Sequence, residues 1–486
     1  DSLIRGLAYG VVNGILLPPI LVSFAAIIFR DSAFGPFLPR LVKLTLFSGG
    51  VHQACFSSLS GLPFAVGSVQ DAGLIFLSAI ASTVVAFGRE KGIDSNEMIS
   101  TVCFVLCSCT AILGAALVAV GHLRLASVVQ YLPMPVVGGY LAYIGYFCGQ
   151  AGLGFVAGID IKGLQDLYLL AEPRALGLAL PTVGAGLVLF LCLRRFPSVL
   201  TLPLLMVAIL VAFFSTLALT GTSLEEARVL GWISEESPSL PWTEAWSFFD
   251  ISSVRWGVFI RVMPNLLAMT LVVAFSSCLD IAAIEMEMGS PLDYDRELKT
   301  VGWSNLVSGL CGGFTGSYIF SQTIFNLRGG IKTRMAGVVT LLMILSVAML
   351  PVNITSYVPK AFFGSLLVLI SLDLMIEWLW ESRRRMMPAE YSVCLFTFAA
   401  VQWLGVEEGM LLGVLAAMVS FAVAYAQIPG VVKARVKGST IMRTFEERVV
   451  LQLYRKQMVT LELEGYIFFG SAIKIHDEVK RWIVWG

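Results

Sequence analysis

Charged residues are scarce in this chain, and their scarcity indicates the solvent in which the chain folds. Asp, Glu, Lys and Arg make up 14% of its 486 residues, whereas a typical soluble protein carries about 25%. Hydrophobic residues make up 57% of the chain, which is too apolar for a soluble protein of this length. The composition therefore excludes a large soluble protein and predicts an integral membrane protein.

Residues that build metal, disulfide and nucleic-acid sites are rare or scattered. The three histidines stand far apart and form no HExxH-type cluster, so we expect no metal centre, no cofactor and no enzyme activity. Most of the nine cysteines lie inside apolar runs without CxxC pairs, as small buried hydrophobic residues do. The net charge is zero and no basic patch occurs, which leaves nucleic-acid binding without an electrostatic basis.

Long apolar runs are what the sequence does contain. A helix needs about 20 apolar residues to cross the hydrocarbon of a bilayer, because backbone polar groups must be satisfied internally there. The runs predict an all-α polytopic membrane protein with about 14 transmembrane segments. They lie at 7–29, 37–58, 69–87, 98–120, 133–152, 175–194, 199–219, 257–283, 299–316, 318–328, 335–352, 359–376, 390–406 and 408–427.

Basic residues give the orientation, because Lys and Arg near span ends are retained on the cytoplasmic side. Four basic clusters, at 194–195, 328–334, 383–385 and 433–437, each follow an even-numbered run. This parity predicts that both termini are cytoplasmic. It also predicts that the long acidic loop 222–256 lies on the opposite side of the membrane.

The acidic loop separates two halves, and the third segment of each half is atypical. Gly61–Ser68 precedes the third segment, and Gly312–Ser317 precedes the tenth, which is too short to cross. Interrupted segments at matching positions predict a transporter binding site, because a helix that starts in mid-membrane presents free N–H groups and partial positive charge. Close helix packing by the glycines is the alternative.

The pattern changes after Lys437. Residues 459–465 alternate between apolar and polar like a strand and lead into a helical stretch that ends at Trp485. We therefore expect a transmembrane domain over 1–430, a linker over 431–445, and a soluble α/β domain that begins at 446. We also expect the chain to be a fragment in which this last domain is cut off.

Several short motifs occur in a fixed order along the chain: Gly14–Pro18, Val66–Gly67, Tyr131–Tyr140, Asn305–Gly309 and Phe320–Ser321. On these motifs the chain resembles the sulfate permease (SulP, or SLC26) family over essentially its whole length. Residues 463–472 resemble the opening of the STAS domain that follows the membrane part in that family. Residues 295–299 also resemble a fungal vacuolar branch of the family that is linked to basic amino acids.

The resemblance implies a 7+7 inverted repeat with half-helices at segments 3 and 10. Segments 1–4 and 8–11 would form a core, and segments 5–7 and 12–14 a gate. It further implies a homodimer in the lipid bilayer, elevator-like movement of the core, and a small charged solute such as sulfate, bicarbonate, chloride or oxalate, coupled to H⁺ or Na⁺. The substrate-binding residues that it implies are Ser68, Val69, Gln70, Asp71, Ser277, Tyr318, Ile319, Ser321 and Gln322.

The chain departs from the family pattern at informative positions. Gln322 stands where the family usually has Arg, and Ser277 stands where it often has Glu, with Asp280 three residues later on the same helical face. Ser68 replaces a proline, and Pro19 replaces a Gln. The loss of the Arg removes the cation that would help to hold an anion.

Asp71 and Asp280 are the candidate ion-coupling residues, because an ionisable group inside a membrane is costly and marks function by default. Asp71 in a first helical turn is alternatively a cap that complements the helix dipole. Asp280 is alternatively a cap or surface partner, since Glu285 and Glu287 follow it. The polar run 291–299 is most simply a solvated loop with a helix start.

These observations support a secondary active transporter and leave its cargo open. The family resemblance favours an inorganic anion such as sulfate. The local charges favour a cation or zwitterion, for example a basic amino acid exchanged against protons. A hypothesis of another class is an anion channel, or a membrane sensor or scaffold that signals through the STAS domain. The sequence leaves open whether the membrane is the plasma membrane or a vacuolar one.

Overall fold

The computed structural model describes residues 2–126, 133–159, 161, 163–196, 198, 200–236, 241–352, 354–427, 431–435, 441–454, 460–463, 475–477 and 479–480. Tyr131 and Leu132 of the fifth-segment motif lie outside the described residues. Residues 464–474, which include most of the predicted STAS opening, also lie outside the described residues, as does Trp485 at the end of the predicted helix.

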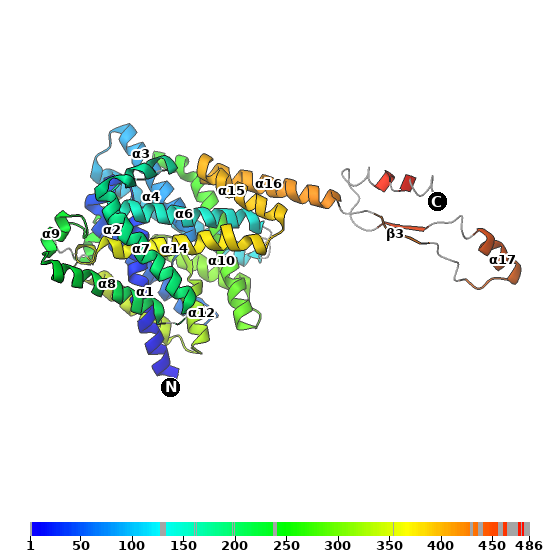
Figure 1. The fold of residues 1–486 in the computed structure, drawn as a ribbon, viewed down its shortest axis with the longest axis horizontal. Coiled ribbons are helices and arrows are strands. Elements are labelled where there is room, and N and C mark those ends of the chain that lie inside the picture. Colours follow the sequence, from blue (N-terminus) through cyan, green and yellow to red (C-terminus); the bar gives the residue numbers. More distant parts are fainter. Residues whose placement is uncertain are drawn as a thin grey trace.

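Helices dominate the described chain, and those from α1 to α16 form one bundle, beyond which the first turns of α1 and the end of α16 project, whereas α17 (Phe445–Tyr454) lies outside it (Figure 1). In the first half they are α1 (Ser2–Ile28), α2 (Leu38–Leu59), α3 (Asp71–Lys91), α4 (Ser95–His122), α6 (Met134–Ala157), α7 (Pro173–Arg195) and α8 (Thr201–Thr220). In the second half they are α10 (Phe259–Met288), α11 (Tyr294–Leu310), α12 (Phe320–Arg328), α13 (Met335–Met349), α14 (Lys360–Met375), α15 (Pro388–Leu404) and α16 (Val406–Gln427).

Each of the fourteen apolar runs overlaps one of these helices. By length and composition, 8 helices of the described chain can cross a membrane. They cover Leu3–Ile28, Asp71–Lys91, Ser95–His122, Pro173–Arg195, Thr201–Thr220, Trp256–Met288, Lys360–Arg384 and Glu408–Tyr425. The multi-pass architecture thus follows from the apolar runs, because only helices satisfy their own backbone groups in lipid.

Two segments differ from what the sequence predicts. The third segment was expected to be a half-helix, but α3 has 21 residues, whereas α12 is short with 9. The polar run 291–299 contains the predicted helix start, because Asp293 caps α11 by accepting from the Arg296 amide at 3.0 Å. The expectation that the run is solvated was wrong for Glu297, which is only 2% exposed and finds its partners in distant parts of the chain.

Two short strands replace helix in front of α3 and α12. β1 (Gly67–Val69) and β2 (Gly316–Tyr318) pair antiparallel, with Ser68 opposite Ser317. A second ladder joins β3 (Val431–Arg435) to β4 (Thr460–Leu463), with α17 (Phe445–Tyr454) between them in sequence. β4 lies within the strand that the sequence predicts at 459–465, and β3 lies within the predicted linker.

The helices of the two halves pack against each other in recurring pairs. α4 packs on α11 and α2 on α13, while α6 and α7 both pack on α14, and α6 also packs on α15. Glycines bring the α4 and α11 backbones together. A Cβ on Gly114 would lie 2.3 Å from the Leu306 nitrogen, and one on Gly302 would lie 2.6 Å from the Val118 nitrogen. Small residues at such contacts are how membrane helices approach closely.

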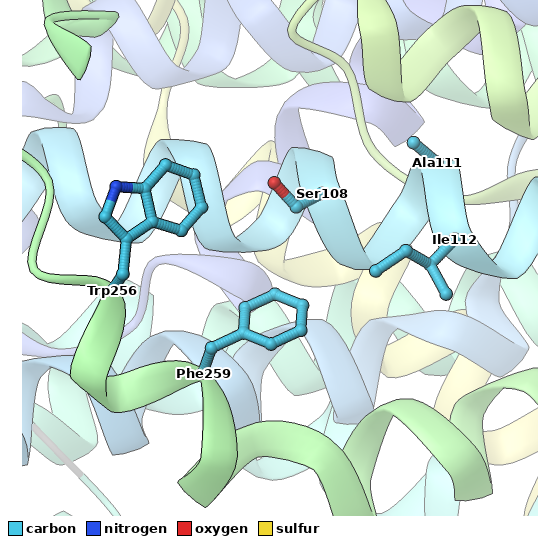
Figure 2. Close-up of a pocket in the computed structure, with 5 residues that line it drawn as sticks. All are labelled: Ser108, Ala111, Ile112, Trp256 and Phe259. Carbon is cyan, nitrogen blue, oxygen red and sulfur yellow. The ribbon is translucent and has the colours of Figure 1, made fainter.

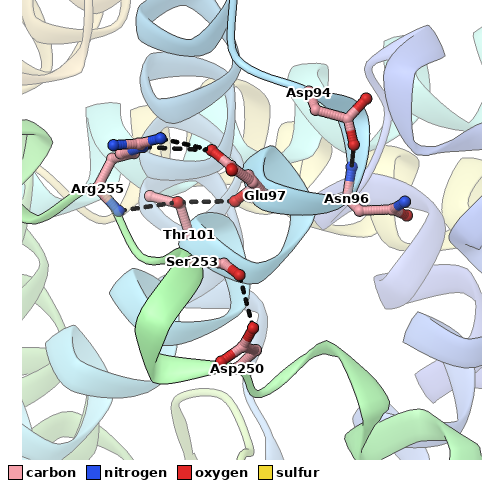
Figure 3. A network of polar contacts seen from close by, with 7 residues as sticks. All are labelled: Asp94, Asn96, Glu97, Thr101, Asp250, Ser253 and Arg255. Atoms are coloured by element: carbon pink, nitrogen blue, oxygen red, sulfur yellow. Dashed lines mark hydrogen bonds and ion pairs between the residues drawn. The ribbon is translucent and has the colours of Figure 1, made fainter.

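The segment before α10 is held to the start of α4. It contains α9 (Leu224–Val229) and the short 3₁₀ turns η3 (Trp242–Phe248), η4 (Ile251–Ser253) and η5 (Trp256–Val258). Figure 3 shows the Arg255 guanidinium donating to Glu97 at 2.9 Å, and the Arg255 amide donating to the Thr101 hydroxyl at 3.2 Å. Hydrogen bonds from the Ser252 and Ser253 hydroxyls lower the pKa of Asp250 in this segment.

The α4–α11 contact yields a first prediction. Gly114→Val should lower the apparent melting temperature and the yield of monodisperse protein, because overpacking a tight contact costs about 1–3 kcal/mol. Gly184→Ala on α7 is the matched control, since its added Cβ meets nothing within 4 Å. Fluorescence-detected gel filtration after a temperature series measures both variants. Equal stability of the two would contradict the packing argument.

Candidate functional site

The β1–β2 ladder places the starts of two helices side by side. β1 leads through Gln70 into α3, which begins at Asp71, and β2 leads through Ile319 into α12, which begins at Phe320. Glycine is required at the crossing because a Cβ on Gly316 would lie 2.3 Å from the Ser68 carbonyl oxygen. Neither helix has a side-chain cap at its N-cap residue. The free N–H groups of both first turns are therefore gathered at one place.

Buried polar side chains hold this irregular backbone. Asn305 on α11 accepts from the Gly316 amide at 2.9 Å and donates to the Gly316 carbonyl at 2.7 Å. His52 on α2 places its Nε2 2.8 Å from the Phe314 carbonyl oxygen. Both side chains are 0% exposed. They supply the hydrogen bonds that a strand of three residues cannot obtain from helix or lipid.

Glu297 joins the two approaches to the ladder. Its carboxylate accepts from the Ser60 hydroxyl at 2.8 Å and from the Gly61 amide at 2.8 Å. The Tyr318 hydroxyl, which belongs to β2, donates to the same carboxylate. A single buried carboxylate of α11 thus fixes the loop before β1 and the end of β2 together.

A cavity of about 810 Å³ lies against the starts of α3 and α12. Of the predicted site residues, the structure brings together Ser68, Val69, Gln70, Asp71, Asp280, Tyr318, Ile319, Ser321 and Gln322 in its lining. Ser277 does not line it, because its hydroxyl faces the Ser317 hydroxyl at 2.7 Å. The neighbouring Ser276 takes that place. The sequence signal was thus correct for the helix but one residue away from the face that borders the cavity.

One wall of the cavity comes from α3, α10 and β1, and we call it the core wall, defined by Ser68, Gln70, Asp71, Ser276 and Asp280. The Gln70 side-chain amide donates to Ser276 at 2.9 Å and to the Asp280 carboxylate at 3.1 Å. The Asp71 and Asp280 carboxylates are close enough for their charges to interact. Asp71 also accepts from the Ala72 amide at 2.8 Å, so it contacts the helix end without serving as the N-cap.

Among the described residues, two buried polar atoms of the core wall have no hydrogen-bond partner. They are Gln70 Oε1, which accepts, and Ser68 Oγ, whose hydroxyl both donates and accepts, in side chains that are 4% and 1% exposed. With Asp280 ionised, the Gln70 side-chain NH₂ must be the donor, because a carboxylate only accepts. In that state Gln70 Oε1 is a buried acceptor without a partner among the described residues. A group that donates hydrogen bonds would satisfy it.

A second wall of the cavity was missed by the sequence reasoning. It comes from α14, its π-helical continuation η7 (Ile376–Glu381), the turn η8 (Ser382–Arg384) and the start of α15. We call it the gate wall and define it by Asp373, Glu377, Trp378, Arg385 and Glu390. Asp373 lies inside the apolar run 359–376, so the presence of a carboxylate in a membrane segment was the signal that could have found this wall.

A second pocket, of about 400 Å³, has no charged side chain among the described residues of its lining and so does not suit a charged solute. It is lined by Ser108, Ala111 and Ile112 of α4, by Trp256 of η5 and by Phe259 at the start of α10 (Figure 2). The Ser108 hydroxyl is its one polar side-chain group apart from the Trp256 indole. The larger cavity, with charged groups on two walls, is therefore the candidate site.

The fold and this central cavity define an integral, multi-pass membrane protein. The model of the sulfate permease family matches residues 3–397, and the chain belongs to that family. The family and the relatives named below are transporters rather than enzymes, as the sequence indicated.

Two curated relatives show the range of the family. The vacuolar basic amino acid transporter VSB1 of Saccharomyces cerevisiae is 26% identical over 97% of this chain and 46% of its own length. The putative sulfate transporter YvdB of Bacillus subtilis is 21% identical over 98% of this chain and 82% of its own length. The chain thus spans about half of the yeast relative, 46%.

Solved structures show the same fold. The structure of SLC26A9 matches with a TM-score of 0.69 at 16% identity, over 90% of this chain and 68% of that one. The transmembrane domain of the cyanobacterial bicarbonate transporter BicA matches with a TM-score of 0.59 at 17% identity, over 86% of this chain and 98% of that one.

The Glu297 contacts yield a second prediction. Glu297→Ala should destabilise the protein by about 1–3 kcal/mol for each buried donor left without a partner. Glu297→Gln keeps one acceptor oxygen and should lose less. Apparent melting temperatures of both variants, with the exposed Glu225→Ala as control, test this order. A melting temperature for Glu297→Ala equal to that of the control would show that the carboxylate does not hold the two strands.

Proposed function

We propose that the chain is a secondary active transporter of a cationic or zwitterionic solute, such as a basic amino acid, coupled to protons. The observation that carries this proposal is the charge of the cavity. Among the described residues that line it are five carboxylates, from Asp71, Asp280, Asp373, Glu377 and Glu390, and one guanidinium, from Arg385. Such a lining attracts a cation and repels an anion.

The unpartnered acceptor of Gln70 supports the same direction. Ammonium and guanidinium groups only donate hydrogen bonds, whereas sulfate and chloride only accept them. A donor satisfies Gln70 Oε1, while an anion leaves it buried without a partner.

Gln322 removes the usual attraction for an anion. It lies in the first turn of α12, lines the cavity and accepts from the Ser321 hydroxyl at 2.6 Å. The first-turn N–H groups of α12 still suit a carboxylate. A zwitterion has both a carboxylate for this helix end and an ammonium for the core wall.

The comparisons divide between the two kinds of cargo. The yeast relative is named for basic amino acids, whereas others are named for sulfate or, like BicA, for bicarbonate. The cavity chemistry of this chain agrees with the first name. An inorganic anion is the rival outcome of the experiments below.

The packing supports alternating access by a core and a gate. If each segment of the first half corresponds to the segment seven places later, α4 corresponds to α13, α2 to α11, α7 to α15 and α6 to α14. Replacing both helices of the α4–α11 pair by their counterparts gives the α13–α2 pair, and the α7–α14 pair gives α15–α6. All four pairs are in contact. This is the pattern expected of two related halves of seven segments each, as in an internal repeat. We infer that segments 1–4 and 8–11 move as a core past the gate, in a homodimer with cytoplasmic termini. The STAS domain from residue 446 stays part of this proposal.

Proton coupling yields a third prediction. Arginine uptake into liposomes with an acidic interior should exceed uptake without a pH gradient, because protons leave as arginine enters. Asp71→Asn and Asp280→Asn should each remove most of this stimulation, because a side-chain amide does not bind and release a proton as a carboxylate does. Glu225→Gln on the exposed helix α9 is the control. Full stimulation in both Asn variants would exclude these residues from the coupling.

The identity of residue 322 yields a fourth prediction. Gln322→Arg should shift selectivity towards anions, because unit charges 4 Å apart at an effective dielectric constant of about 20 interact by about 4 kcal/mol. We expect sulfate to compete with arginine at least about tenfold better in the variant, a change of about 1.4 kcal/mol. Tracer competition in proteoliposomes measures this. Unchanged selectivity would contradict the role given to the missing cation.

A further inference from the structure

The gate wall has carboxylates that the fold leaves without partners. Asp373 is exposed on α14 towards the cavity, and Glu377 is half-buried on the π-helical turn η7. Neither carboxylate has a hydrogen bond or an ion pair within the part of the chain that the structure describes. π-helical turns inside α-helices are frequent at functional sites, and this turn presents Glu377 and Trp378 to the cavity.

Two arginines, Arg194 and Arg385, lie near this stretch of the chain. Glu381, one turn beyond Glu377, pairs with Arg194 at 2.7 Å and with Arg385 at 3.6 Å. Asp373 and Glu377 stand four residues apart, where like charges destabilise a helix. Arg194 and Arg385 act on these two carboxylates only from a distance, because the direct ion pairs of both arginines go to Glu381. A cation in the cavity relieves the repulsion between Asp373 and Glu377.

The core wall supplies independent evidence for a ligand in the same cavity. Gln70 Oε1 and Ser68 Oγ lack partners among the described residues, in side chains that are more than nine-tenths buried. These atoms come from β1 and the residue that follows it, whereas Asp373 and Glu377 come from α14 and η7, and all four residues line the same cavity. One cavity therefore holds two groups of polar atoms from different elements.

We propose that Asp373 and Glu377 form a second cation subsite, so that the cavity selects a solute with two cationic groups at its ends. One cationic group binds Gln70 and Asp280 on the core wall, and the other binds Asp373 and Glu377 beside Trp378, whose ring suits a cation. This inference rests on the proposed function and narrows its substrate class. A basic amino acid or a diamine fits both subsites, whereas a neutral zwitterion fits only the first.

The test compares arginine with citrulline, which has the same length but an uncharged ureido end. Wild-type protein in proteoliposomes should show a KM for arginine lower than that for citrulline by at least about tenfold, the size expected for a charged hydrogen bond. The double variant Asp373→Asn with Glu377→Gln should raise the KM for arginine to within about twofold of the citrulline value. Its KM for citrulline should stay unchanged.

Two controls separate the possible failures. The single variants Asp373→Asn and Glu377→Gln should each give part of the effect, and they replace the double variant if it does not fold. Glu225→Gln tests for a general effect of surface charge. If the wild type takes up neither arginine nor citrulline, the proposed function fails and this inference with it. If arginine uptake is present and its preference over citrulline survives in every gate-wall variant, this inference alone is overturned.

Discussion

The antiparallel pairing of β1 with β2 is the constraint on which the rest of the site depends. Backbone that is neither helical nor exposed to water must find hydrogen bonds within the protein. Here the ladder, with Asn305 and His52 behind it, supplies them. Two helices can therefore begin at one place inside the bundle, and their starts border one cavity.

The charges placed around this frame are the basis of the proposed function. Helix starts alone favour an anion, since their N–H groups and dipoles are positive. Asp71 stands at one helix end and Gln322 in the first turn of the other, so neither end keeps an additional cation. The gate wall adds further carboxylates. A frame that other family members use for anions thus has, in this chain, a lining suited to a positively charged group.

Local sequence patterns predicted the fold better than the site. The apolar runs place every helix of the bundle, because burial in lipid depends on composition along a single segment. The paired interruptions at Gly61–Ser68 and Gly312–Ser317 indicated where α3 and α12 begin, but not the β1–β2 pairing in front of them. The burial of Glu297 was not predictable, because its partners Ser60 and Tyr318 come from other segments.

The two misplaced parts of the site have the same physical cause. Ser276 and Ser277 are neighbours that lie on different faces of α10. A resemblance between motifs does not show which of two neighbouring residues faces the cavity. Asp373 and Glu377 approach Asp71 and Gln70 only through the packing of α14 in the tertiary structure. Their separation along the chain leaves no periodic signal that links them.

Tracer counterflow in proteoliposomes tests the central claim most directly. Liposomes are loaded with unlabelled arginine or unlabelled sulfate and supplied with the matching labelled compound, with bicarbonate and chloride as competitors. The account predicts that labelled arginine accumulates, that neither competitor reduces its uptake, and that labelled sulfate does not accumulate. Accumulation of sulfate without accumulation of arginine would contradict the account.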